Sequence, residues 1–190
     1  MPRRPRYELP NGLVHVTARG NRRQAIALDD RDFERFLGTV SDVHRHTRLQ
    51  WLAYCVMGNH YHFLVDGSRT DLSDAMHRLN GTYAQAFNRR HGLDGHLFQD
   101  RFYAVAVVSE WHLFELLRYI ALNPVRAGLC DFPAEYRWSS FAATTGVAHA
   151  PRFLAVAAVL ARFGADPRQS RESFAAFVIE ALPEATRVAA

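Results

Sequence analysis

The sequence contains no lysine, so all 23 of its basic residues are arginine. Cysteine is almost as scarce, because Cys55 and Cys130 are the only two and they form no CxxC pair. This count argues against a structural zinc site and requires no disulfide, as is typical of proteins in a reducing cytoplasm. No apolar run approaches the roughly 18–20 residues of a membrane span, and no signal-peptide stretch follows Met1–Arg6. We therefore expect a cytoplasmic protein with no membrane partner.

Several common catalytic motifs are also missing. The sequence has no GxxxxGK(S/T), GxGxxG, GxSxG or HExxH pattern. Nucleotide hydrolysis, dinucleotide redox chemistry, serine hydrolysis and zinc proteolysis therefore have no support, and we expect no nucleotide cofactor. The 190 residues are 48% hydrophobic and 22% charged, which suits one globular domain plus a modest extension.

The sequence does contain a concentration of arginine near its start. The net charge is +4, and six arginines in the first 23 residues face a single acid, Glu8. These six are Arg3, Arg4, Arg6, Arg19, Arg22 and Arg23. A GC-rich genome explains arginine in place of lysine, but it does not explain the clustering. Clustered arginines of this kind are typical of an arm that contacts phosphates.

Hydrophobic periodicity predicts six elements in the order strand, helix, strand, strand, helix, strand. The strands are expected at Leu13–Arg19, Leu49–Met57, His60–Val65 and Phe102–Val108, and the helices from Asp29 or Asp30 to about His46 and from Leu72 to about Arg90. Gly58 and Asn59 form a two-residue hairpin signal between the second and third strands. This order predicts an α+β, ferredoxin-like fold, a βαββαβ antiparallel sheet with both helices on one face.

Further helices are expected after the last strand. Ser109 can cap a helix that ends one or two residues before Pro124, because proline should stop it. Two more helices are predicted near Arg152–Phe163 and Ser170–Leu182. We therefore expect a main domain over residues 1–145, with the basic arm, and a helical extension over residues 146–190. Whether this extension packs on the main domain stays open at this point.

His60, Tyr61 and His62 form a His-x-His pattern in the third predicted strand. Residues i and i+2 of a strand point to the same face, so both imidazoles project together while Tyr61 and Phe63 point the other way. Two neighbouring histidines make half of a divalent metal site. Exposed strand histidines with no ligand role give the same pattern, so the pair alone does not decide between the two interpretations.

The helix after the last strand presents a second group of polar residues. At helical spacing, Leu113, Leu116, Leu117 and Ile120 form the buried stripe, and His112, Glu115, Tyr119 and Asn123 form a polar stripe beside it. Tyr119 and Asn123 are four residues apart and lie one above the other. Taken alone, they fit a boundary tyrosine and a helix-terminating asparagine. Taken with the histidines, the Asn123 carbonyl can complete a metal site that polarises a phosphate, with Tyr119 as the candidate nucleophile.

Together these motifs resemble those of a known family. GNHYHFLV is similar to the His-hydrophobe-His motif of the HUH endonuclease superfamily, and RYIALNPVRAG resembles the nucleophile helix of its single-tyrosine transposases. ARGNRRQAI, FQDRF and YRWSS also resemble the branch called REP-associated tyrosine transposases, within the IS200-like transposases. The resemblance covers most of residues 7–145.

The resemblance implies a DNA transposase that nicks and rejoins single-stranded, hairpin-containing DNA. By it, His60, His62 and Asn123 are ligands of Mg²⁺ or Mn²⁺, and Tyr119 is the nucleophile that forms a 5′-phosphotyrosine. Better-known insertion-sequence relatives place a glutamine at the third ligand position, so Asn123 is a shorter side chain there. Members of these groups are monomers or homodimers, and either state is expected.

DNA of this kind would be held by basic residues and by aromatic side chains that stack on bases. The candidates for phosphate or base contact are Arg3, Arg4, Arg6, Arg22, Arg23 and Arg126. The main alternative is a regulatory protein that binds DNA hairpins without cleaving them. An RNA-binding module with the same sheet topology is a weaker one, because the aromatic signature of such modules is absent from the inner strands. Of the other tyrosines, Tyr54 and Tyr103 are expected in the core.

Overall fold

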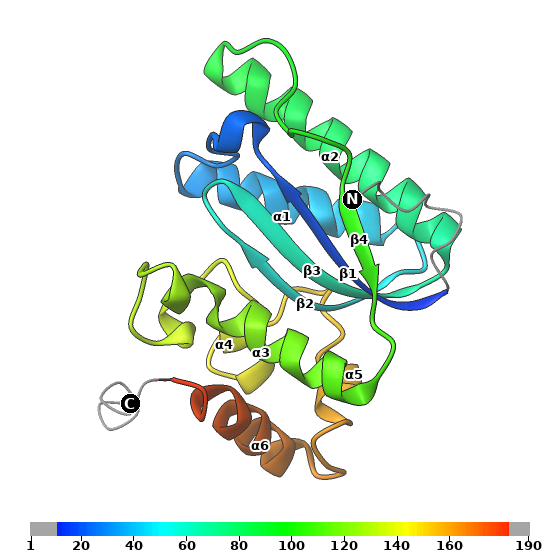
Figure 1. Ribbon diagram of the computed structural model, residues 1–190, viewed down its shortest axis with the longest axis vertical. Helices are drawn as coiled ribbons and strands as arrows, with labels where there is room; N and C mark the ends of the chain where they lie inside the picture. Colours follow the sequence, from blue (N-terminus) through cyan, green and yellow to red (C-terminus); the bar gives the residue numbers. More distant parts are fainter. Residues whose placement is uncertain (1–10, 183–190) are drawn as a thin grey trace.

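The computed structural model describes residues 11–182 and shows a four-stranded antiparallel sheet with helices on both faces (Figure 1). The strands are β1 (Gly12–Arg19), β2 (Gln50–Val56), β3 (His60–Gly67) and β4 (Tyr103–Ala106). The helices are α1 (Asp30–His44), α2 (Arg69–His91), α3 (Glu110–Arg126), α4 (Phe141–Thr145), α5 (Val156–Leu160) and α6 (Pro167–Ile179). The strand order β2-β3-β1-β4 and the βαββαβ connectivity confirm the predicted ferredoxin-like fold.

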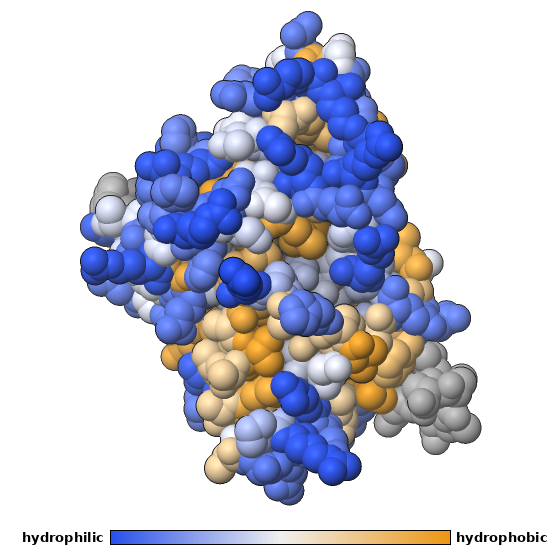
Figure 2. Space-filling model, turned by 180° about the vertical axis from the view of Figure 1, so that it is seen from behind, coloured by the Kyte–Doolittle hydropathy of each residue, from blue (hydrophilic) through white to orange (hydrophobic). Residues whose placement is uncertain are grey.

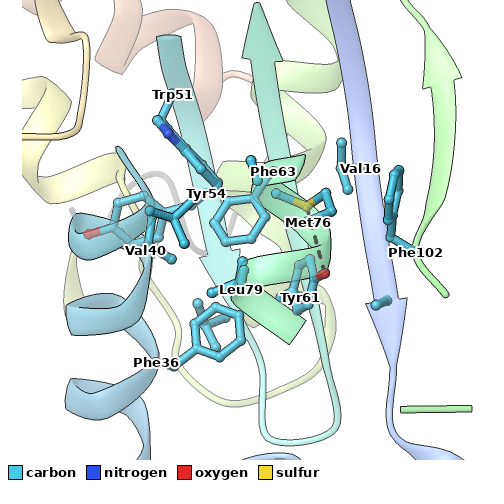
Figure 3. Close-up of a cluster of buried hydrophobic side chains, with 14 of the residues drawn as sticks. Val16, Phe36, Val40, Trp51, Tyr54, Tyr61, Phe63, Met76, Leu79 and Phe102 are labelled. Atoms are coloured by element: carbon cyan, nitrogen blue, oxygen red, sulfur yellow. Dashed lines mark hydrogen bonds between the residues drawn. The ribbon is translucent and has the colours of Figure 1, made fainter. Parts of the chain in front are cut away.

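One face of the sheet is covered by α1 and α2 (Figure 1). Alternate residues of the central strands point to this face, among them Val16 on β1 and Tyr61 and Phe63 on β3. Figure 3 shows them packed against Phe36 of α1 and against α2, with the Tyr61 hydroxyl directed at Met76. Tyr61 therefore points away from the histidines, as predicted.

The opposite face is covered by α3 and by the C-terminal helices. Leu64 of β3 and Leu113, Leu117 and Ile120 of α3 belong to a second buried cluster that also includes Phe174 of α6. The expected buried stripe of α3 is therefore confirmed. α6 packs against α3, α4 and α5, and α5 also contacts β2. The segment from α5 to α6 thus lies against the same face of the sheet as α3.

The helix ends agree with the sequence at most positions. Side chains of Asp29, Ser68 and Ser109 accept hydrogen bonds at the N-termini of α1, α2 and α3, as expected of N-caps. Gly92 ends α2 in the left-handed conformation that glycine adopts without strain. The predicted stop at Pro124 was wrong, since α3 continues to Arg126.

The surface differs between the two ends of the molecule. Seen from behind, hydrophilic residues cover most of the upper part, and hydrophobic areas gather in the lower half (Figure 2). Within residues 11–182, no helix combines the length and the apolar character that a membrane crossing requires.

Candidate active site

The site lies on the face of the sheet that α3 covers. Antiparallel pairing aligns Cys55 of β2, His62 of β3, Thr17 of β1 and Tyr103 of β4 in one row across this face. One row further on, Arg19 is paired with His60. Because paired residues point to the same side of a sheet, the two histidines and Arg19 face α3 together.

The two ring nitrogens of His62 differ in their hydrogen bonding. Its Nδ1 lies 3.0 Å from the Nε2 of His15, which stands on β1, and the two rings stack at 5.2 Å between centroids. Its Nε2 is buried and has no hydrogen-bond partner among the described residues. Burial lowers the pKa of His62 to about 3 and that of His15 to about 4, with neighbouring histidines adding to both effects. Both rings are therefore neutral near pH 7, the state that a metal ligand needs.

His60 is held by two asparagines. Its Nδ1 lies 2.6 Å from the Oδ1 of Asn59, and since that oxygen only accepts, Nδ1 carries the hydrogen. Burial and the nearby Arg19 lower the pKa of His60, while a hydrogen bond with the Asn123 side chain acts in the opposite direction. Asn123 is itself buried at the end of α3, with 8% of its surface exposed. The structure thus brings His60, His62 and Asn123 together, as the sequence predicted.

Tyr119 stands on α3 directly beside the histidines. Its ring meets His62 edge-on at 5.2 Å between centroids and His15 at 6.3 Å. The guanidinium of Arg126 lies 5.5 Å from the centre of the tyrosine ring, which is cation–π distance. Tyr119 is half-buried, so its phenol can be reached from the cleft that it lines.

A cleft of about 360 Å³ opens in front of these residues, and we refer to it as the tyrosine cleft. It is lined by Thr17, Ala18, Arg19, His60, His62, Gln99, Asp100, Arg101, Tyr103 and Tyr119. The segment Gln99–Arg101 is placed there because the Gln99 N–H donates to the Arg19 carbonyl at 2.9 Å, next to an isolated bridge between Gly20 and Phe98. Gly20 permits the close approach of the Gln24 carbonyl on its other side, since a Cβ at Gly20 would lie 2.0 Å from that oxygen.

Several residues in or beside the cleft were missed by sequence reasoning. His15, Thr17 and Arg19 alternate on β1 and share the histidine face, a signal that strand periodicity contains. Tyr103 was expected in the core, but 54% of its surface is exposed and it lines the cleft. The reason is alternation along β4, because Phe102 takes the buried position and Tyr103 takes the opposite one.

The structure describes three of the six arginines proposed for DNA contact. Arg126 is exposed and lies beside Tyr119. Arg22 and Arg23 are exposed in a turn after β1, both with positive φ, a conformation that costs energy for residues other than glycine. Arg3, Arg4 and Arg6 lie outside the described residues. The DNA-binding role of all six stays a prediction.

The possible metal ligands at this site fit a divalent cation only if the Asn123 amide oxygen is counted among them. Within residues 11–182, no group of three or more histidine, cysteine, aspartate or glutamate side chains could hold a metal ion. Two imidazole nitrogens and the Asn123 amide oxygen are the groups on hand, and the unpartnered Nε2 of His62 is a buried nitrogen suited to a ligand. The residues are therefore compatible with the predicted ligand set, whose role stays a prediction.

Comparison with known proteins identifies the chain. The family model described as "Transposase IS200 like" matches residues 9–123, more than half of the sequence. The fold, the site and this match together define a DNA-processing protein of the transposase class. The chain belongs to the IS200-like transposase family, which confirms the resemblance stated from its motifs.

One solved structure supports the same fold. The chain is similar to a REP-associated tyrosine transposase bound to a REP hairpin, with 20% identity, a TM-score of 0.61, and coverage of 82% of this chain and 92% of that one. It also matches a chain from Deinococcus radiodurans R1 assigned as a transposase, with 18% identity, a TM-score of 0.42, and coverage of 63% of this chain and 95% of that one. No curated protein sequence matches at a significant level.

Proposed function

We propose that this chain nicks and rejoins single-stranded, hairpin-containing DNA through Tyr119, with a 5′-phosphotyrosine intermediate. The observation that carries the proposal is the position of Tyr119, whose ring contacts His62 within the tyrosine cleft. Among the described tyrosines, Tyr54, Tyr61 and Tyr83 are buried in the core, so they are not available to a DNA strand. Membership of the IS200-like transposase family supports DNA as the substrate.

Cleavage exchanges one ester bond for another. The Tyr119 hydroxyl oxygen attacks the phosphorus, the new O–P bond forms as the P–O3′ bond breaks, and the phenol proton passes to a base. The departing 3′ oxygen takes up a proton and becomes a free 3′-hydroxyl. Rejoining is the reverse step with a 3′-hydroxyl from another DNA end, so it needs no nucleotide hydrolysis.

The other side chains around Tyr119 have two proposed roles, to offset the charge of the DNA strand and to hold a metal ion. Arg126 beside Tyr119 and Arg19 in the cleft wall place positive charge near the nucleophile, which offsets the charge of the strand. His60, His62 and Asn123 would hold Mg²⁺ or Mn²⁺, and such an ion polarises the scissile phosphate when it is bound. Burial keeps the two histidines neutral, so their ring nitrogens keep the lone pairs that a ligand uses.

Hairpin DNA is the substrate that the solved relative suggests. That REP-associated tyrosine transposase has the same fold and was solved bound to a REP hairpin. We extend this to the present chain, with phosphate or base contacts from Arg22, Arg23 and Arg126, and from Arg3, Arg4 and Arg6 outside the described residues. The oligomeric state, a monomer or a homodimer, stays a prediction.

The test is a nicking assay on end-labelled single-stranded hairpins taken from beside the gene, in Mg²⁺, Mn²⁺ or EDTA. We expect a covalent protein–DNA adduct that requires the metal and that Tyr119→Phe reduces to background while hairpin binding persists. Tyr103→Phe is the matched control, because Tyr103 lines the same cleft and should leave the adduct unchanged. The double variant His60→Ala/His62→Ala should also lose the adduct.

Two results would overturn the proposal. An adduct that survives in Tyr119→Phe would assign the nucleophile elsewhere. Hairpin binding with no adduct, across several flanking sequences and both metals, would favour a regulatory protein that binds DNA hairpins without cleaving them.

A further inference from the structure

A second cavity lies beyond the wall of the tyrosine cleft, and we refer to it as the α2 cavity. Its volume is about 600 Å³, and it opens between α2 and the segment Gly95–Phe102. Gln99, Asp100 and Arg101 line both cavities, so this short segment separates them. A DNA strand that occupies the tyrosine cleft therefore needs to cross only this segment to enter the α2 cavity.

The α2 cavity combines apolar and polar surfaces. Met76, Phe98 and Phe102 line it and are buried side chains of the core. Figure 3 shows Met76 beside Tyr61 and places Phe102 close to β1. His77 and His96 line it from α2 and from the facing segment, and both are exposed. A planar group with apolar faces and a polar edge matches such a lining.

Asn80 supplies a hydrogen-bonding amide group to the α2 cavity. The hydroxyl of Tyr61, which is fully buried, donates to the Oδ1 of Asn80 at 2.8 Å. With its oxygen turned toward Tyr61, the amide directs its NH₂ group away from that hydroxyl. Because Asn80 lines the α2 cavity, the NH₂ group is positioned for an acceptor bound there.

Gly81 leaves space in the cavity wall. It lies in the interior of α2, where glycine destabilises a helix relative to other residues. A Cβ at this position would meet no atom within 4 Å, so packing within the chain does not require glycine here. The absence of a side chain therefore widens the α2 cavity at a cost to the helix.

We propose that the α2 cavity binds one unstacked base of the single-stranded DNA that flanks the cleaved phosphate, a proposal that rests on the proposed function. The apolar lining accommodates the faces of the base, and the Asn80 NH₂ group donates to a carbonyl oxygen or ring nitrogen on its edge. The wall shared with the tyrosine cleft makes the occupied base a near neighbour of the scissile phosphate. Binding there contributes to the choice of cleavage position.

The first measurement locates the base. Hairpins carrying 2-aminopurine at successive flank positions are titrated with the full chain in EDTA, so that cleavage does not interfere. We expect the fluorescence of one position to change sharply, because a base leaves its stacked neighbours there. An abasic site at that position should weaken binding about tenfold, since one base contact is worth about 1–3 kcal/mol.

The second measurement fills the cavity. Gly81→Leu should bind the hairpin with an intact flank about tenfold more weakly than wild type does. On the abasic hairpin, where the base is already missing, the variant and wild type should bind equally. Gly38→Leu is the matched control, because Gly38 is an exposed glycine within α1 whose Cβ would also meet nothing within 4 Å. Both variants should raise the melting temperature, but only Gly81→Leu should weaken binding. Asn80→Asp keeps the Tyr61 bond, removes the donor and gives a second test.

The outcomes separate this proposal from the proposed function. If wild type forms the adduct while Gly81→Leu and Asn80→Asp bind like Gly38→Leu, the base site is wrong and strand cleavage stands. If no adduct forms, but Gly81→Leu and the abasic site cause the same, non-additive loss of binding affinity, the proposed strand cleavage is wrong and the base site stands. A 2-aminopurine response that is unchanged in Gly81→Leu would place the unstacked base outside the α2 cavity.

Discussion

His62 uses its two ring nitrogens differently. Nδ1 lies at hydrogen-bond distance from His15, and Nε2 is buried without a partner among the described residues. For Nε2 to keep a lone pair, Nδ1 must carry the hydrogen and the Nε2 of His15 must accept it. His15 therefore acts through His62, as a positioning residue that sets its tautomer and ring orientation.

Replacing His15 should weaken metal binding without unfolding the chain. His15→Ala removes the hydrogen-bond partner of His62, and partners of metal-bound histidines are commonly worth about 10–100-fold in affinity. We expect Mn²⁺ affinity, measured by calorimetry or electron paramagnetic resonance, to fall by about tenfold or more. His46→Ala is the control, since His46 is an exposed residue after α1. Equal Mn²⁺ affinity in His15→Ala and wild type would remove the positioning role.

Periodicity was sufficient to place the main residues of the site. The i, i+2 rule put His60 and His62 on one face, and the i, i+4 rule put Tyr119 above Asn123. His15 could not be assigned in the same way, because its contact with His62 joins residues 47 positions apart and depends on the register of β1 against β3. Register is a property of the assembled sheet.

At the scale of elements, α3 is held from both sides. One side packs on the sheet, and on the other Arg118 joins it to α6. The Arg118 guanidinium lies 3.8 Å from the Phe177 ring centre, donates to the Phe177 carbonyl at 3.1 Å and pairs with Glu115 at 3.0 Å. The helix that carries Tyr119 therefore depends on α6 for its position.

Loss of this contact should destabilise the chain. We expect Arg118→Leu to lower the free energy of unfolding by about 1–2 kcal/mol, since it removes a cation–π contact and hydrogen bonds to a charged group. Urea unfolding followed by circular dichroism measures the change. Arg168→Leu serves for comparison, because Arg168 is 91% exposed and pairs only with Glu172 among the described residues. A similar loss in both variants would mean that the α3–α6 contact is not the cause.

The N-terminus of α1 is tied to the C-terminus of α2 by an ion pair between Asp29 and Arg90. The hydrogen bond from Arg90 lowers the pKa of Asp29 to about 2, below its usual 3.8. A carboxyl with a lowered pKa stabilises the fold above its unfolded pKa and loses that contribution as pH falls.

We therefore expect stability to decline between about pH 4 and pH 2, as Asp29 is protonated. Asp29→Asn should flatten this part of the profile of unfolding midpoint against pH, because asparagine still caps α1 but does not titrate. A profile that keeps the same slope in the variant would assign the decline to other carboxylates.

The order and type of the main elements followed from sequence, but several boundaries did not. Pro124 lacks the N–H that the preceding turn needs, yet α3 continues because Pro124 is buried and the Ala127 N–H reaches the Asn123 carbonyl. The last strand and the helix near Arg152–Phe163 are shorter than periodicity predicted. Such ends depend on neighbouring elements that a local pattern does not describe.

At the scale of the whole molecule, two hydrophobic clusters lie on opposite faces of one sheet. The sequence predicted helices after residue 150 but left their packing open, because amphipathic periodicity shows a buried face and not its partner. The structure shows α6 within the cluster that also holds α3. Residues 156–179 therefore share a core with the sheet.

We expect the chain to unfold in a single transition. Phe174→Ala, at a side chain that is 3% exposed, should cost about 3–5 kcal/mol and shift the whole transition. The change in tryptophan fluorescence, expected mainly from the buried Trp51 and Trp138 because Trp111 is already exposed, should coincide with circular dichroism during urea unfolding. Two separate transitions would instead show that the predicted extension over residues 146–190 folds as an independent unit.

Along β3, the residues that face Tyr119 alternate with the residues that hold the sheet to α1 and α2. His60 and His62 can therefore change without disturbing Tyr61 and Phe63, whose rings pack on the other face. In a lineage under no selection to cut DNA, the two histidines can be replaced, while selection for solubility preserves Tyr61 and Phe63. Its descendants would keep the fold and lose the cleavage activity. A shared fold among such relatives would then not imply a shared activity.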